Sequence, residues 1–138
     1  MAKLSQTELQ AFMDASPYIK FSGIQITELD HETETLIVRM PLRAEFERGP
    51  GSKQFHGGPI AALIDTAGCF ALIMSTGTPV PTINFRTDYL RPAVDTQLTA
   101  EAKVRRVGRS VGVVDVDVFN DAKALVAVGR GAFGTQAG

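Results

Sequence analysis

The chain has 138 residues, a formal net charge of -1 and the composition of an ordinary globular protein. This near-neutral charge gives no general electrostatic field for nucleic acid, and Asp65 interrupts the longest apolar run before it reaches membrane-spanning length. The only cysteine, Cys69, cannot form an internal disulfide, which fits a reducing cytoplasm, and with two histidines a zinc site is not expected. We therefore expect a single domain over residues 1–138 in the cytoplasm, with no metal ion and no nucleic-acid or membrane partner.

The segment before residue 57 predicts a short helix, two strands and a long loop. Ser5 and Glu8 have the spacing of a capping box, and an apolar stripe follows them. Apolar and polar residues then alternate in two runs around a turn near Asp30. A long ordered loop is often functional, although a solvated crossover is an equal alternative. The expected elements are a helix over about 5–15 within an N-terminal helical extension over 1–19, strands over 24–31 and 34–40, and an irregular connection over 41–56.

The stretch from His56 to Thr76, HGGPIAALIDTAGCFALIMST, predicts one long and mostly buried helix. Pro59 suits the first turn of a helix, and Gly77 suits its C-terminal cap. Asp65 is the single charged residue of this segment, and burying an unpaired carboxylate is costly. Asp65 therefore needs either a functional role or a structural hydrogen bond to a neighbouring strand or hydroxyl.

Four strand-like runs follow the helix, and short connections separate them. Short connections favour antiparallel neighbours, so these runs predict an antiparallel meander. Together with the two earlier strands, they indicate an α+β fold in which a curved antiparallel sheet wraps around one long central helix. The four runs cover roughly residues 82–90, 96–107, 110–119 and 125–133.

The start of the central helix is a candidate site for a carbonyl oxygen. Gly57 and Gly58 leave backbone N–H groups unobstructed, and the helix dipole adds partial positive charge; a glycine turn that only admits the chain into the helix is the alternative. His56 is either a general acid or base or a residue that shapes the loop. Asp65 lies eight residues after Gly57, about 12 Å along a straight helix. One carbonyl cannot contact both groups of one chain, so a site that uses both requires two copies.

These residues resemble a known family. The segment FHGGPIAALIDTAG, with its spacing from His56 to Asp65, is similar to the signature of the phenylacetic-acid-degradation type of hotdog-fold acyl-CoA thioesterases. The segment TINFRTDYLRPA, residues 82–93, and the expected hairpin over 104–114 are similar to the elements that follow in that family. The resemblance covers roughly residues 20–134, and its motifs are more specific together than either is alone.

The resemblance implies a hotdog fold, a homodimer formed by paired sheet edges, assembly of dimers into a homotetramer, and an active site that spans two subunits. It implies that the Gly57 N–H polarises the carbonyl of an acyl-CoA thioester, while Asp65 from the other subunit acts as nucleophile or as general base for water. Thr82 matches a position where the family often has a hydroxyl that helps to place this water. CoA is then part of the substrate, and no separate cofactor is expected.

Further substrate contacts are expected from the same resemblance. Gly58 lies beside the polarising N–H, and Arg106 and Arg109 are candidates for the CoA phosphates, although solvated surface arginines are at least as good an interpretation. Relatives often carry Asn or Gln six residues before the histidine, and this position is Pro50 here. Residues that could contribute in its place are Ser52, Gln54 and Asn84.

The sequence therefore predicts a cytoplasmic acyl-CoA thioesterase that releases a free acid and CoA. Pro50 motivates a second hypothesis, a non-catalytic hotdog protein that binds acyl-CoA or an acyl carrier. A hotdog dehydratase or hydratase is a third, but those sites pair a histidine with a carboxylate on a different motif. No pattern in the sequence identifies the acyl group.

Overall fold

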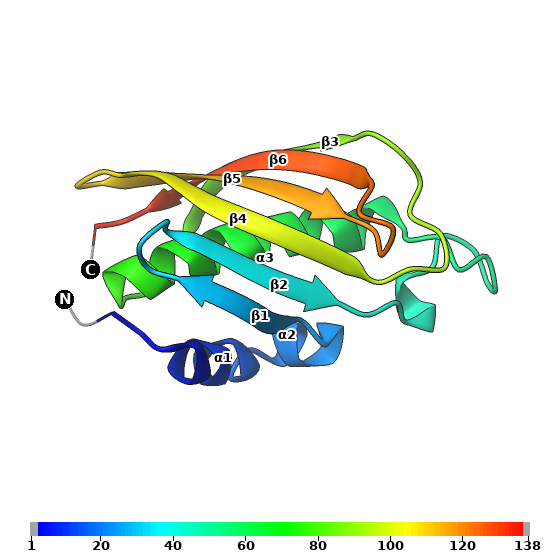
Figure 1. Cartoon of the computed structure of the whole chain (residues 1–138), viewed down its shortest axis with the longest axis horizontal. Coiled ribbons are helices and arrows are strands. Elements are labelled where there is room, and N and C mark those ends of the chain that lie inside the picture. The colour runs from blue at the N-terminus through cyan, green and yellow to red at the C-terminus, as the bar shows by residue number, and fades with distance from the viewer. Residues whose placement is uncertain (1–2, 137–138) are drawn as a thin grey trace.

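The computed structural model describes residues 3–136 and shows a curved antiparallel sheet of six strands around one long helix, α3 (Figure 1). This confirms the predicted α+β hotdog fold. Two short helices, α1 and α2, precede the sheet, and one turn of 3-10 helix, η1, interrupts the loop before α3. The elements are α1 Gln6–Asp14, α2 Pro17–Ser22, β1 Gln25–Asp30, β2 Thr35–Met40, η1 Ala44–Phe46, α3 Gly57–Thr76, β3 Thr82–Tyr89, β4 Leu98–Val107, β5 Val111–Phe119 and β6 Leu125–Gly134.

The N-terminal helix forms as its sequence predicts. The Ser5 hydroxyl accepts a hydrogen bond from the Glu8 N–H at 3.1 Å, and the Ser5 N–H donates to Glu8 Oε1 at 3.0 Å. This capping box fixes the start of α1. Leu9 and Met13, one turn apart, are fully buried and anchor α1 on the core. Helix α2 then ends at Gly23, whose φ of 75° is a left-handed conformation that favours glycine.

Helix α3 lies at the centre of the core, as predicted. His56 is its N-cap residue, so the helix begins at Gly57, and Gly77 ends it with a φ of 74°. An added Cβ at Gly68 would lie 3.0 Å from Cζ of Phe133, so this glycine allows the sheet to pack directly on the helix. By length and composition α3 could cross a membrane, but 56% of its apolar 18-residue stretch is buried inside the molecule. The surrounding sheet makes α3 a core helix (Figure 1).

The position of β3 corrects the predicted meander. The strand order is β1-β2-β4-β5-β6-β3, so only β4, β5 and β6 form a meander, and β3 lies at the far edge beside β6. The segment between β3 and β4 does not close a hairpin, and its middle part bonds to the loop before α3 instead. The Phe55 N–H donates to the Ala93 carbonyl at 2.9 Å, and Gln54 forms an isolated bridge with Val94. Residues 90–97 therefore cross the end of the sheet at the start of α3 to reach β4 (Figure 1).

Strand β3 is an exposed edge of the sheet. Most of its residues are exposed, among them Ile83 (57%) and Tyr89 (53%). On its outer side, β3 has no strand partner within residues 3–136. An edge strand with exposed apolar side chains is a template for pairing with a second chain.

Candidate active site

The start of α3 presents two backbone N–H groups. The Gly57 N–H donates to Nδ1 of His56 at 2.8 Å, so the imidazole caps the helix and its Nδ1 is an acceptor. The Gly58 N–H has no acceptor within residues 3–136. The dipole of a long helix adds partial positive charge at this point. An incoming carbonyl oxygen can therefore accept a hydrogen bond from the Gly58 N–H directly. It can also accept from the Gly57 N–H, either by displacing His56 Nδ1 or by sharing this N–H with it.

Tyr89 holds this helix start from the end of β3. Its hydroxyl donates to the Gly57 carbonyl at 2.7 Å. An added Cβ at Gly57 would lie 3.2 Å from the Tyr89 hydroxyl oxygen. The bond fixes the orientation of the peptide that carries the Gly58 N–H. Sequence reasoning missed Tyr89 as a site residue, because its role depends on an edge strand that ends beside the start of α3. The only signal was its place in the segment TINFRTDYLRPA, which the resemblance already included.

Asp65 and Thr82 are brought together within one chain, by the kind of hydrogen bond to a hydroxyl of a neighbouring strand that was the structural alternative for Asp65. Asp65 is half-buried on α3, and the Thr82 hydroxyl donates to Asp65 Oδ1 at 2.8 Å. No cation lies within 4.0 Å of this carboxylate in the described part of the chain. The carboxylate therefore keeps free lone pairs that can accept a proton or attack a carbonyl carbon.

The two halves of the site lie at opposite ends of β3. Thr82, the first residue of β3, contacts Asp65, and Tyr89, the last, contacts Gly57. Asp65 and Gly57 are themselves about 12 Å apart along the helix axis. A single chain therefore holds both halves, but it does not bring them to one substrate carbonyl.

A groove of about 410 Å³ lies beside the start of α3. One wall is polar and includes His56, Gly57 and Tyr89. The rest of the lining combines apolar side chains with one amide and two guanidinium groups, in residues Arg48, Gln54, Phe55, Ile60, Leu90, Arg91, Pro92 and Ala93. The groove thus gives a partly apolar ligand access to His56 and Gly57 at the start of α3.

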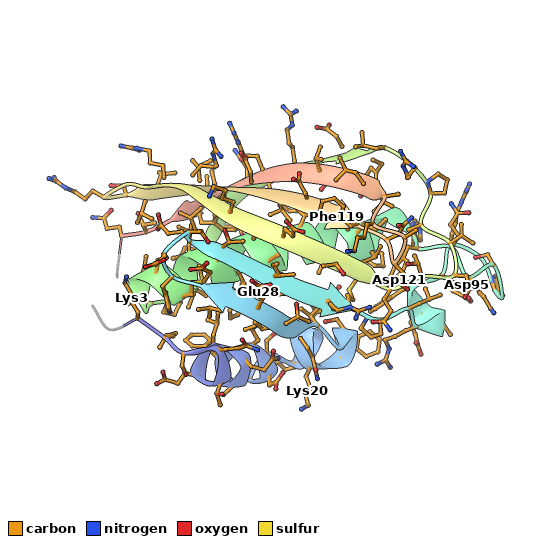
Figure 2. All side chains as sticks on the ribbon, in the orientation of Figure 1. Lys3, Lys20, Glu28, Asp95, Phe119 and Asp121 are labelled. Atoms are coloured by element: carbon orange, nitrogen blue, oxygen red, sulfur yellow. The ribbon has the colours of Figure 1, made fainter. Side chains whose placement is uncertain are left out.

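The groove is built where the crossover 90–97 meets the loop before α3. The Asp95 N–H donates to the Lys53 carbonyl at 2.8 Å, and the His56 N–H donates to the Phe46 carbonyl at 2.8 Å. Asp121 ties the crossover to the β5–β6 turn, because its carboxylate accepts from the Gln97 N–H at 3.1 Å. Figure 2 shows Asp95 and Asp121 at the same end of the molecule as these loops. The long loop that the sequence singled out is therefore an ordered wall of the groove.

Arg106 and Arg109 lie at the opposite end of the sheet. They belong to the β4–β5 hairpin, and Gly112 beside that hairpin pairs with Phe133, which also pairs with Thr82. The hairpin is therefore level with the Asp65 half of the site, and its tip is far from the start of α3 (Figure 1). Neither arginine lines the groove of its own chain.

The predicted amide and loop residues are dispersed. Asn84 is exposed on β3 and Pro50 is exposed at the tip of the loop before α3, and neither lines the groove. The Ser52 hydroxyl accepts from the N–H groups of Gly49 and Gln54, so it stabilises the loop. Only Gln54 of the three candidate replacements reaches the groove.

Cys69 packs against the core, one turn after Asp65. Its thiol donates to the Val80 carbonyl at 3.3 Å. Burial, together with the nearby Asp65 charge, raises the pKa of the Cys69 thiol to about 12. A thiol with this pKa is protonated at neutral pH and is a poor nucleophile.

A larger hollow of about 620 Å³ lies on the outer face of the sheet and contains none of the predicted site residues. Charged side chains dominate its lining, and Arg130 and Asp115 form a cross-strand pair among them. Arg130 Nε donates to Asp115 Oδ1 at 2.6 Å, which holds the pKa of that carboxyl below its usual range. Asp88 and Asp115 have arginine partners here, whereas Glu101 and Asp117 have no cation within 4.0 Å in the described part of the chain. This face lacks the helix N-terminus that the α3 site has.

Known proteins share this fold and sequence. Residues 54–127 match the family model of the thioesterase superfamily. The chain is 36% identical to an esterase-type protein of Halobacterium salinarum over 91% of this chain and 88% of the relative. It is 37% identical to the acyl-coenzyme A thioesterase PaaI of Escherichia coli over 81% of this chain and 77% of that enzyme. The solved structure of the E. coli PaaI protein superposes with a TM-score of 0.81 at 28% identity, covering 97% of both chains.

These matches cover the residues that build the site. The family model spans more than half of the chain and includes the start of α3, Asp65 and the whole of β3. The two relatives cover most of their own length as well as most of this chain. The chain therefore belongs to the thioesterase superfamily as a PaaI-like hotdog protein, and it is a thioester hydrolase.

Proposed function

We propose that this enzyme hydrolyses acyl-CoA thioesters to a free acid and CoA, in an active site that two subunits share. The observation that carries the proposal is the division of the site along β3, with Asp65 bound at one end of the strand and Gly57 at the other. The acyl-CoA substrate is proposed because the related E. coli enzyme is named for that activity. We also propose a cytoplasmic location, as the sequence predicted.

The shared site follows from pairing two copies through β3. Antiparallel pairing about a two-fold axis sets the Thr82 end of one β3 beside the Tyr89 end of the other. Asp65 of the partner subunit then approaches the Gly57 N–H group, and the same contact forms twice. The exposed apolar side chains of β3 support this interface. A tetramer of two such dimers remains a prediction from the family resemblance.

The groups present suit hydrolysis of a thioester. The carbonyl oxygen binds at the Gly57 and Gly58 N–H groups, which stabilise the negative charge that develops on it. Asp65 of the partner subunit either takes a proton from water as the water attacks, or attacks the carbonyl carbon to form an anhydride that water then cleaves. In both routes the C–S bond breaks and CoA leaves as the thiolate. Thr82 holds the Asp65 carboxylate in place.

Thiol release tests this proposal. Purified wild type and Asp65→Asn are compared on short, medium, long and aryl acyl-CoAs, with Asp14→Asn at the exposed end of α1 as a matched control. We expect the Asp65 variant to lose about 10²- to 10⁴-fold in turnover, as for loss of a general base, while the fold and acyl-CoA binding persist. Near-normal turnover in Asp65→Asn would remove Asp65 from the mechanism. Binding without any thiol release by wild type would favour the non-catalytic hypothesis instead.

A further inference from the structure

The arginines of the described chain fall into two groups. Five have a carboxylate oxygen within 4.0 Å, namely Arg39, Arg43, Arg86, Arg105 and Arg130. The other four have no such partner within residues 3–136, and they are Arg48, Arg91, Arg106 and Arg109. Unpaired guanidinium groups are available for an anionic ligand.

Two of the unpaired arginines flank the groove at the start of α3. Arg48 comes from the loop before α3 and Arg91 from the crossover after β3, and both line the groove. Their backbones are held in place, because the Arg48 N–H donates to the Gln54 carbonyl at 2.8 Å and the Arg91 N–H to the Val126 carbonyl at 3.3 Å. No Asp or Glu lines this groove. The groove therefore carries two guanidinium groups and no carboxylate, and Gly57 at the start of α3 belongs to the same lining.

The groups in this groove suit the parts of an acyl-CoA thioester. Tyr89 contacts Gly57 at the carbonyl site, and Arg91 follows two residues later, at most about 7 Å further along the chain. The lining residues Leu90, Pro92 and Ala93 offer apolar contact to a flexible arm. A guanidinium group binds phosphate oxygens in a bidentate manner, which fits the anionic end of such a substrate.

We propose that Arg48 and Arg91 bind the phosphate groups of the CoA part of the substrate, in the same subunit that binds the carbonyl at α3. This inference rests on the function proposed above. The expectation that Arg106 and Arg109 contact the phosphates stays a prediction, because their hairpin is level with the Asp65 half of the site. Under this proposal, the groove recognises its ligand mainly through the phosphate groups rather than through the acyl group.

Binding of thioethers, which cannot be hydrolysed, tests the arginines separately from catalysis. Calorimetry compares S-hexyl-CoA with S-hexyl-pantetheine, which has the same arm without the nucleotide phosphates. We expect Arg48→Gln and Arg91→Gln each to weaken S-hexyl-CoA binding about tenfold, the usual effect of losing one charge-assisted hydrogen bond, and to leave S-hexyl-pantetheine binding unchanged. Arg105→Gln is the matched control, because it lies on the outer face and Asp115 keeps its bond to Arg130.

Two results would overturn the inference. One is an unchanged affinity for S-hexyl-CoA in both groove variants, and the other is an equal loss for both thioethers, which would indicate a structural effect. A parallel assay of thiol release from acyl-CoA and from N-acetylcysteamine thioesters keeps the two proposals apart. Hydrolysis without arginine-dependent binding contradicts the arginine assignment alone, whereas arginine-dependent binding without hydrolysis contradicts the proposed function alone.

Discussion

At the scale of single residues, the Gly57 N–H is the group whose removal is most informative. Gly57 is the first residue of α3, where proline is well tolerated, and the extended conformation of His56 suits a following proline. Gly57→Pro therefore deletes one N–H with little change to the backbone. We expect kcat/KM to fall about 10²- to 10³-fold, as for removal of one oxyanion donor, while the melting temperature stays close to that of wild type.

Gly57→Ala is the control for this change. It keeps the N–H and adds a Cβ that would lie 3.2 Å from the exposed Tyr89 hydroxyl, a side chain that can shift. We expect it to retain most of the activity that Gly57→Pro loses. Normal thioester hydrolysis by Gly57→Pro would instead assign carbonyl polarisation to Gly58 alone.

Cys69 gives a prediction on pH. Burial raises the pKa of its thiol to about 12, and only the thiolate is nucleophilic, so reactivity appears only as the pH approaches that value. We expect the native protein to resist iodoacetamide at pH 8 and the urea-unfolded protein to take up one equivalent, measured by mass spectrometry. Rapid labelling of native protein at pH 8 would contradict the buried environment. The same inertness leaves released CoA as the thiol that a colorimetric assay detects.

Residue types and spacing predicted one part of the site and missed another. His56, Gly57 and Asp65 lie on one continuous segment, so the sequence alone predicted their order and separation. The family resemblance gave Thr82 a role in placing water, and the structure shows its hydroxyl 2.8 Å from Asp65 Oδ1. Tyr89 has no such local pattern, because its partner lies 32 residues earlier and is a backbone carbonyl.

At the scale of elements, the packing of α3 against the sheet depends on glycines with little room beside them. An added Cβ at Gly112 would lie 2.7 Å and 2.9 Å from the two methyl carbons of Leu72, a side chain that is fully buried. We expect Gly112→Ala to lower the free energy of unfolding by about 1–3 kcal/mol, the usual cost of overpacking. Urea unfolding measures this. Gly49→Ala is the control, since nothing lies within 4 Å of its added Cβ, and an equal effect in both variants would contradict the packing argument.

The extents of the elements were predictable, but the place of β3 was not. Capping residues predicted the bounds of α1 and α3 to within a few residues. The alternation of apolar and polar residues did the same for most strands. Strand order depends on where a connection finds hydrogen-bond partners. The crossover 90–97 bonds to the loop before α3, and a short connection with Pro92 carries no local sign of that long-range pairing. The wall of the groove that residues 90–97 contribute, including Arg91, was missed for the same reason, whereas the loop before α3 was singled out from the sequence.

At the scale of the whole molecule, the divided site predicts that the active species is at least a dimer. The unpaired outer side of β3 is the surface we expect to be covered. Light scattering at micromolar concentration should give at least twice the mass of one 14.8 kDa chain. A monomer under those conditions that still hydrolyses thioesters would contradict the shared site.

Subunit complementation tests the shared active site most directly. Gly57→Pro and Asp65→Asn each inactivate both sites of their own homodimer. In a mixed dimer, one site combines the intact Gly57 of one subunit with the intact Asp65 of the other, and the second site has neither. Co-refolding the two variants at equal amounts should therefore restore about one quarter of the wild-type thiol release per subunit, because half of the dimers are mixed and each has one intact site. Activity no greater than the sum of the two separate variants would contradict an active site shared between subunits.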